Sequence, residues 1–296
     1  MRSRIFFGFL VFLFLWPHPG AAQTAGNRVT ILYDAFGKAL AMKKAWGFSA
    51  LVEYGGKRIL FDTGGDADIF EHNVKALGVD LTKLDFVVLS HRHSDHISGV
   101  NYLLRVNPKV KIYTAADPWG PFGWSAPKSM YRQDESLPAN MRYFDGNLPD
   151  MVTASTPWPQ ANFVRIDSTT EIAPGIFLVP TISQVPGTLE LREISMAIRG
   201  PQGLIVVAGC SHAGVEKVLE AAAKIDPHVR VLFGGIHLVG APDAEVQRIS
   251  AALHDQWKLD YIAVGHCTGE PTFAALQKTF GDRYLYAGLG TVIDIP

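Results

Sequence analysis

The stretch His91-Arg92-His93-Ser94-Asp95-His96 places three histidines and one aspartate within six residues. The apolar run 85–90 before it predicts a buried strand, and residues 97–100 after it have the character of a helix start. The cluster is therefore predicted on the turn between a strand and a helix, where side chains face a cleft.

Imidazole and carboxylate groups are the ligands of zinc, iron and manganese sites. His91 and His93 are two residues apart on an extended segment, so they point to the same side. Asp95 and His96 follow on the next bend and can serve a second ion. A polar surface loop is the alternative, and we disfavour it because histidine is uncommon and four potential ligands fall together.

The order H-x-H-x-D-H in this stretch resembles the signature of the metallo-β-lactamase superfamily. The resemblance implies an α/β fold, an αββα sandwich of the metallo-β-lactamase type, with a one- or two-metal site at one edge.

Length and charge narrow the class of protein. The 296 residues, 48% of them hydrophobic, suffice for one large core, and two small domains are the less favoured division. Lysine plus arginine (27) balances aspartate plus glutamate (28), so no nucleic-acid surface is expected. A small-molecule substrate is the expected partner.

The N-terminus has the pattern of an export signal. Arg2 and Arg4 precede the apolar run 5–16, and Gly20 and Ala22 stand at the −3 and −1 positions of a cleavage site. A membrane span needs roughly 20 apolar residues. We therefore predict a signal peptide at 1–22, a single domain at 23–296, a periplasmic or secreted location and no stable membrane insertion after cleavage. An uncleaved anchor is the alternative.

Residues 48–54 and 57–61 flank Gly55-Gly56 and predict a hairpin with a two-glycine turn. Asp62 ends this hairpin. The superfamily resemblance implies that its carboxylate lies behind the metal ligands and accepts a histidine N–H. Asp62 as an Asx-turn residue before glycine is the other interpretation, and both can hold.

The segment at about 115–160 is an insert crowded with proline and tryptophan. Proline at this density breaks long helices and central strands. We expect a lid or wall over the metal cleft that sets the substrate, with Trp119, Phe122 and Trp124 as candidate substrate contacts. Packing of these aromatics on their own segment is the alternative.

The C-terminal third repeats one pattern three times: a strand, glycine with a reactive side chain, then a helix. The strands are 204–208, 229–233 and 261–264, and each offers one histidine after its end. Ligands collect at the carboxyl ends of such strands. His212, His237 and His266 are thus predicted to face one site.

The chain departs from the most common superfamily pattern. No histidine occurs between His96 and His212, and Cys210 stands where a bridging aspartate is expected. The motifs Gly-Cys-Ser-His, Gly-Gly-x-His-Leu and His-Cys-Thr-Gly resemble instead the dihydropterin ribofuranosylaminobenzene phosphate synthase-like branch.

From this resemblance we assign His91, His93 and His212 to one metal and Asp95, His96 and His266 to the second. The ions are expected to be two zincs, with iron and manganese as alternatives. His237 lies at the rim as ligand or proton donor, and Asp95 and His237 are the candidate catalytic residues.

Cys210 and Cys267 each stand next to a proposed ligand. Three interpretations stay open: a thiolate that binds zinc or replaces the missing bridge, a disulfide beside the site, or buried inert thiols.

The leading hypothesis is an exported metal-dependent hydrolase, in which metal-activated water attacks an ester, phosphoester or related bond. A transferase of the synthase type named above is the second hypothesis. An iron-dependent oxidoreductase and a non-catalytic metal-binding protein complete the alternatives.

Overall fold

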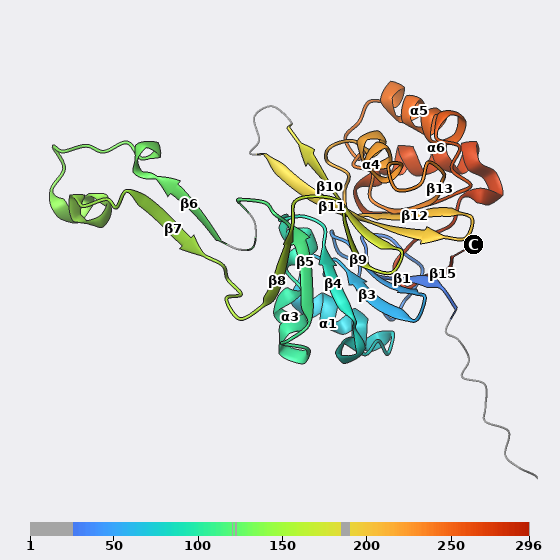
Figure 1. Ribbon diagram of the computed structural model, residues 1–296, viewed down its shortest axis with the longest axis horizontal. Coiled ribbons are helices and arrows are strands. Elements are labelled where there is room, and N and C mark those ends of the chain that lie inside the picture. Colours follow the sequence, from blue (N-terminus) through green and yellow to red (C-terminus); the bar gives the residue numbers. More distant parts are fainter. Residues whose placement is uncertain (1–25, 120, 122, 185–189, 296) are drawn as a thin grey trace, which may run out of the picture.

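The computed structural model describes residues 26–119, 121, 123–184 and 190–295. The predicted signal peptide at 1–22 and Phe122 lie outside these residues. Two mixed β-sheets pack face to face, with helices on both outer sides (Figure 1). The four-layer αββα sandwich expected from the sequence is confirmed. No helix in the described part of the chain is long and apolar enough to cross a membrane.

The first sheet is built mainly from the N-terminal half, and its strand order is β15-β1-β2-β3-β4-β5-β8. Strands β1 to β3 and β15 pair antiparallel, whereas β3, β4, β5 and β8 run parallel. The bounds are β1 Arg28–Tyr33, β2 Ser49–Tyr54, β3 Lys57–Phe61, β4 Phe86–Leu89, β5 Lys111–Ala115, β8 Asn162–Ile166 and β15 Val292–Asp294.

The second sheet is built from the C-terminal half, in the order β14-β13-β12-β11-β10-β9. Strands β12, β13 and β14 are parallel and the others antiparallel. The bounds are β9 Thr170–Ala173, β10 Ile176–Ser183, β11 Leu191–Gly200, β12 Gly203–Ala208, β13 Val229–Gly234 and β14 Tyr261–Val264.

Helices cover the outer face of each sheet. The first sheet carries α1 Ala67–Ala76, the one-turn helix α2 Ser94–Ile97 and α3 Val100–Val106. The second carries α4 Val215–Ala222, α5 Asp243–Ala251, which continues into a π-helical turn at Ala252–Gln256, and α6 Glu270–Phe280. Helix α1 begins at an N-cap, Asp66, whose carboxylate accepts hydrogen bonds from the N–H groups of Asp68 and Ile69.

Three apolar layers hold the sandwich together. The central layer lies between the sheets and includes Phe61 and Leu178, both fully buried. The outer layers join the first sheet to α1 and α3 and the second sheet to α4, α5 and α6. Strand β12 is buried at all six positions because both of its faces are covered.

The predicted hairpin is confirmed: β2 and β3 pair in register from Tyr54–Lys57 to Ala50–Phe61 around Gly55-Gly56. The helix after the histidine cluster begins earlier than expected. Helix α2 starts at Ser94, so Asp95 and His96 lie in a helical turn and not on a bend. Strand β15 joins the first sheet beside β1.

The insert at 115–160 contains a two-stranded hairpin, β6 Gly123–Pro127 and β7 Met151–Ser155, with short 3-10 turns between. Figure 1 shows this hairpin extending away from both sheets. The expected lid over the cleft is wrong for this arrangement, because none of the described residues of the insert lines the cavity at the metal ligands.

The Leu178→Ala variant tests whether the apolar layer between the sheets stabilises the fold. Replacing Leu178 by Ala removes buried apolar atoms between the sheets and is expected to lower the free energy of unfolding by about 2–5 kcal/mol. Urea unfolding with a chelator present measures this without a contribution from bound metal. Leu40 is fully exposed (101%), so Leu40→Ala is the matched control, and it should change the unfolding free energy by less than about 0.5 kcal/mol. Equal effects of the two variants would contradict the layer assignment.

Candidate metal centre

Asp62, at the end of β3, organises the histidine cluster from behind. Its carboxylate is fully buried and accepts hydrogen bonds from the Ser90 N–H (2.7 Å) and the Ser90 hydroxyl (2.7 Å). It also accepts one from His96 Nδ1 at 2.7 Å. His91 Nδ1 lies 2.9 Å from the same Ser90 hydroxyl. Asp62 therefore holds His96 directly and His91 through Ser90, and both imidazoles keep Nε2 free for an ion.

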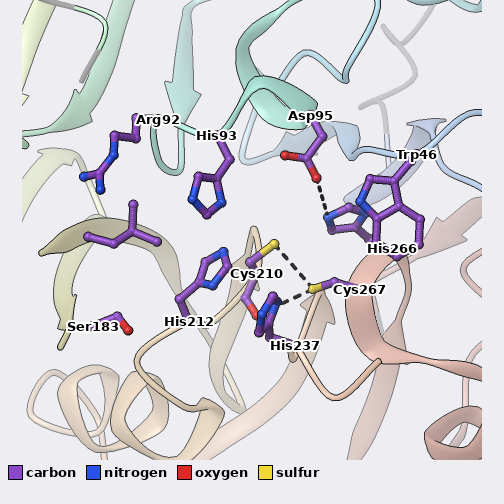
Figure 2. Close-up of a pocket in the computed structure, with 11 residues that line it drawn as sticks. Trp46, Arg92, His93, Asp95, Ser183, Cys210, His212, His237, His266 and Cys267 are labelled. Carbon is purple, nitrogen blue, oxygen red and sulfur yellow. Dashed lines mark hydrogen bonds and ion pairs between the residues drawn. The ribbon is translucent and has the colours of Figure 1, made fainter. Parts of the chain in front are cut away.

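The first group of candidate ligands is His91, His93 and His212, whose ligand atoms all lie within 4.8 Å of one another. His91 and His93 follow β4, and His212 follows β12 on the facing sheet. His91 Nε2 is 3.1 Å from His93 Nδ1. The rings of His93 and His212 are 4.7 Å apart and nearly perpendicular. Figure 2 shows these last two side chains pointing toward one another across the cavity.

The second group is Asp95, His96 and His266. The Nε2 atoms of His96 and His266 are 3.2 Å apart, and His266 Nε2 lies 3.4 Å from an Asp95 carboxylate oxygen. The His266 backbone N–H donates to buried Asp34 at 3.0 Å, which fixes the start of the turn after β14.

A third group, Cys210, His237 and Cys267, lies beside the other two. The two sulfur atoms are 3.4 Å apart and both cysteines are free. His237 belongs to this group and to neither of the histidine–aspartate groups, and its ring centroid lies 4.0 Å from that of His212, with the ring planes tilted by 48°.

The residues fit bound metal ions. Ligand atoms of one tetrahedral zinc, with bonds of about 2.0–2.3 Å, lie about 3.3–3.8 Å apart. The nitrogen pairs at 3.1 and 3.2 Å are close to this spacing. In addition, His212 Nε2 is buried without a hydrogen-bond partner among the described residues. Unpartnered buried imidazole nitrogens are costly unless a cation binds in the cluster.

Burial sets the protonation of the cluster. It lowers the pKa of His91 well below its ordinary range and the pKa of His212 to about 3, and in both cases neighbouring imidazoles lower it further. Burial works to raise the pKa of Asp95, but hydrogen bonding to His266 and the charge of His96 hold it below its usual range. Neutral imidazole and ionised carboxylate are the forms that bind metal.

The three groups open onto one cavity of about 460 Å³. Trp46 and Leu191 form an apolar part of the cavity wall. Arg92 and Ser183 form a polar part (Figure 2). Arg92 forms an ion pair with Asp117 and donates to the Glu190 carbonyl oxygen at 2.8 Å.

The structure brings together every ligand candidate predicted from the sequence. The histidines outside the set lie elsewhere; His72, for example, contacts the Ala41 carbonyl oxygen. The sequence analysis missed several residues around the site, namely Asp34, Trp46, Ser90, Arg92, Ser183, Leu191 and Glu193.

Glu193 is the most notable omission, because burial raises its pKa to about 8 beside His91, 3.9 Å away. The signal available in the sequence is a glutamate directly before the mostly apolar stretch 194–198.

Known proteins resemble this chain in sequence and in fold. The family model described as the metallo-beta-lactamase superfamily matches residues 47–182. A 7,8-dihydropterin-6-methyl-4-(beta-D-ribofuranosyl)-aminobenzene-5'-phosphate synthase of Methanocaldococcus jannaschii is 28% identical over 78% of this chain and 83% of its own length. An uncharacterized protein of the same organism is 25% identical over 84% of this chain and 93% of its own length.

Among solved structures, a metal-dependent hydrolase of the beta-lactamase superfamily aligns with a TM-score of 0.67 at 23% identity, over 91% of this chain and 99% of that one. A metallo-beta-lactamase fold protein from Bacillus subtilis aligns with a TM-score of 0.57 at 15% identity, over 90% and 98% of the two chains. At these sequence identities, the structural matches show similarity of fold alone.

The Asp62→Asn variant tests whether the hydrogen bonds accepted by the Asp62 carboxylate strengthen metal binding. The amide keeps the size of the carboxylate but replaces one of its two acceptor oxygens by a donor, so it cannot accept all three hydrogen bonds from Ser90 and His96, and zinc affinity should fall about 10–100-fold. Competition with a chromophoric chelator measures the affinity. Asp66→Asn is the matched control, since Asp66 is an exposed helix cap and asparagine caps equally well. Unchanged affinity in Asp62→Asn would contradict the role given to this carboxylate.

Proposed function

The chain belongs to the metallo-β-lactamase superfamily, and from this premise we propose that it is an exported hydrolase that uses two zinc ions to cleave an ester, phosphoester or related bond. Its fold and histidine-rich site are those of a metal-dependent enzyme. The kind of bond, the identity and number of the ions and the location outside the cytoplasm belong to the proposal.

The donor set supports zinc. Five imidazoles and one carboxylate form the two groups, and thiols lie next to them. Nitrogen and sulfur donors suit zinc, whereas manganese prefers oxygen. When bound, a pair of such ions supplies a nucleophilic water at neutral pH and stabilises the attacking and leaving oxygens. Iron stays the alternative, and metal analysis of the purified protein distinguishes the two.

His237 is the candidate proton donor. A side-chain hydrogen bond with Cys267 raises the pKa of His237 above its ordinary value, so the imidazole keeps its proton to higher pH. The ring lines the cavity beside His212, where it can give a proton to a leaving oxygen. Asp95 stays ionised, so its carboxylate can orient a group bound at the second metal position.

The cavity supports a small-molecule substrate. Its volume of about 460 Å³ is in the range of ligand sites. A second cavity of about 550 Å³, lined by Phe36 and Phe273, shares Trp46 and His266 with the first. We propose that the reacting bond lies at the ligand groups and that an apolar part of the substrate extends past Trp46 into the second cavity.

The export pattern at residues 1–22 supports a periplasmic or secreted location. It also separates the leading proposal from the second one, a synthase reaction, because cytosolic pterin intermediates would not be met outside. The 28% identity to the Methanocaldococcus synthase favours that second candidate. Incubation with a pterin diphosphate and an aminobenzene phosphate would form a coupled product if the synthase reaction operates. If hydrolysis operates, only the hydrolysis products of the pterin diphosphate would form.

Removing two ligands tests the metal-dependent reaction. His91→Ala combined with His93→Ala should lower bound zinc by at least one equivalent and lower hydrolysis of an ester and phosphodiester panel at least 100-fold. Plasma mass spectrometry and initial rates measure these. His228→Ala, an exposed histidine away from the cluster, is the control and should keep both. Full metal content and activity in the double variant would refute the proposal.

The Trp46→Ala variant tests whether the substrate extends past Trp46 into the second cavity. An aromatic contact contributes about 0.5–1.5 kcal/mol, so Trp46→Ala should lower kcat/KM for an aromatic ester about twofold to tenfold. An acetate ester of similar leaving group, too short to pass Trp46, should react at an unchanged rate. Equal losses on both esters would show that Trp46 acts on the ligand groups and not on the substrate.

A further inference from the structure

We propose that the sulfur of Cys210 bridges the two metal positions as a thiolate, in the place where the sequence lacks a bridging carboxylate. This inference rests on the proposed function only in requiring that two ions bind. It assigns a role to a cysteine for which the residue pattern left three interpretations open.

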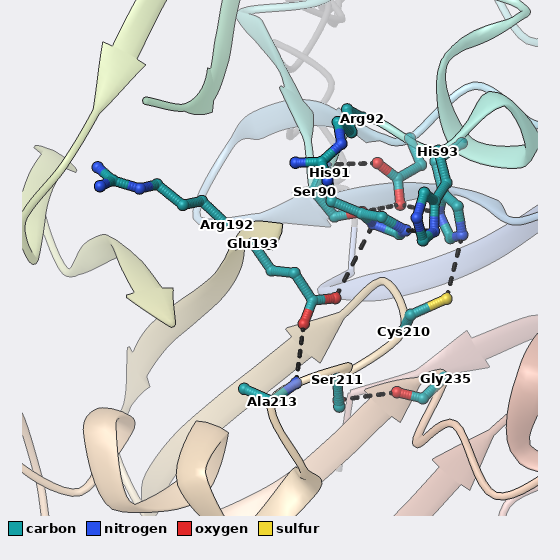
Figure 3. A network of polar contacts seen from close by, with 12 residues as sticks. Ser90, His91, Arg92, His93, Arg192, Glu193, Cys210, Ser211, Ala213 and Gly235 are labelled. Carbon is teal, nitrogen blue, oxygen red and sulfur yellow. Dashed lines mark hydrogen bonds and ion pairs between the residues drawn. The ribbon is translucent and has the colours of Figure 1, made fainter. Parts of the chain in front are cut away.

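The position of the sulfur carries the inference. Cys210 Sγ lies 3.2 Å from His96 Nε2, which belongs to the second ligand group. The same sulfur forms a group within 4.8 Å with His91, which belongs to the first. The Cys210 sulfur is therefore 3.2 Å from a member of the second group and within 4.8 Å of a member of the first. Figure 3 shows its sulfur directed at the imidazoles and away from the backbone of β12.

The backbone around Cys210 is shaped for this approach. A Cβ at Gly209 would lie 2.1 Å from the Ser90 hydroxyl and 3.0 Å from the Asp62 carboxylate. A Cβ at Gly235 would lie 2.8 Å from Cys267 Sγ and 3.3 Å from Cys210 Cα. Glycine on both sides thus lets the strand end press against the groups that orient His91 and His96. Larger residues there would push the sulfur out of reach.

The chemistry of sulfur suits a bridge. A thiolate bonds to zinc at about 2.3 Å, so one sulfur can span ions that stand about 3.5–4 Å apart. Binding replaces the S–H bond by two sulfur–metal bonds and releases one proton to solvent. No oxidant is needed. Cys267 Sγ lies 3.4 Å from the Cys210 sulfur.

Cobalt is the probe, because thiolate-bound Co²⁺ has a near-ultraviolet charge-transfer absorption that imidazole and carboxylate ligands do not produce. The metal-free protein, Cys210→Ser, Cys210→Asp and Cys267→Ser are each titrated with Co²⁺, and bound cobalt is counted by mass spectrometry after dialysis. Circular dichroism of each variant checks the fold. Cys267→Ser is the matched control, since it removes the neighbouring thiol and leaves the proposed bridge.

We expect two cobalt equivalents and the thiolate absorption in the unmodified protein and in Cys267→Ser. Cys210→Ser should lose the absorption and bind at least one equivalent at least tenfold more weakly. Cys210→Asp should lose the absorption but keep two equivalents, because a carboxylate can also bridge.

Two outcomes overturn the bridge while leaving the hydrolase proposal standing: two bound equivalents without the absorption, or an absorption that disappears in Cys267→Ser and persists in Cys210→Ser. A Cys210–Cys267 disulfide in the purified protein, found by thiol counting after denaturation, also overturns it. A protein that binds no cobalt and no zinc overturns the proposed function as well.

Discussion

The hydrogen bonds that the Asp62 carboxylate accepts are the constraint on which the site depends. A fully buried carboxylate is stable only if its oxygens are satisfied, and here Ser90 and His96 satisfy them at 2.7 Å. Asp62 has a positive φ of 57°, a conformation that few residues other than glycine adopt readily. The strained turn at the end of β3 is held because it is tied to β4 and α2. The Asp62 carboxylate in turn fixes the tautomer of His96 directly and that of His91 through Ser90.

The metal centre is formed by residues from both halves of the chain. His91, His93, Asp95 and His96 follow β4 in the first sheet, whereas His212, His237 and His266 follow β12, β13 and β14 in the second. Each candidate ion has ligands from both sheets. Metal binding is thus coupled to closure of the sandwich, and the apolar layer between the sheets brings the histidines within bonding distance before an ion arrives.

The fold and the ligand set do not choose between hydrolysis and group transfer, because both reactions need an activated oxygen or a stabilised leaving group at the ions. What separates them is access of water and the shape of the cavity beside the ligands. The cavity at the ligands is bounded by Trp46 and Leu191 on its apolar side and by Arg92, which Asp117 holds, on its polar side. These residues, and not the distant hairpin β6–β7, are the first place to look for selectivity.

The sequence by itself determined the fold class, the candidate ligands and their division between strand ends. It did so because H-x-H-x-D-H and three strand–glycine–histidine units are local patterns, and parallel strands carry their carboxyl ends to a common edge. It also marked Cys210 as a departure. Only the tertiary structure decided that Cys210 lies beside His96 and within 4.8 Å of His91, that Glu193 is buried beside His91, and that the Pro/Trp-rich hairpin points away from the cleft. These depend on how two sheets pack through side chains far apart in the chain, which local periodicity does not encode.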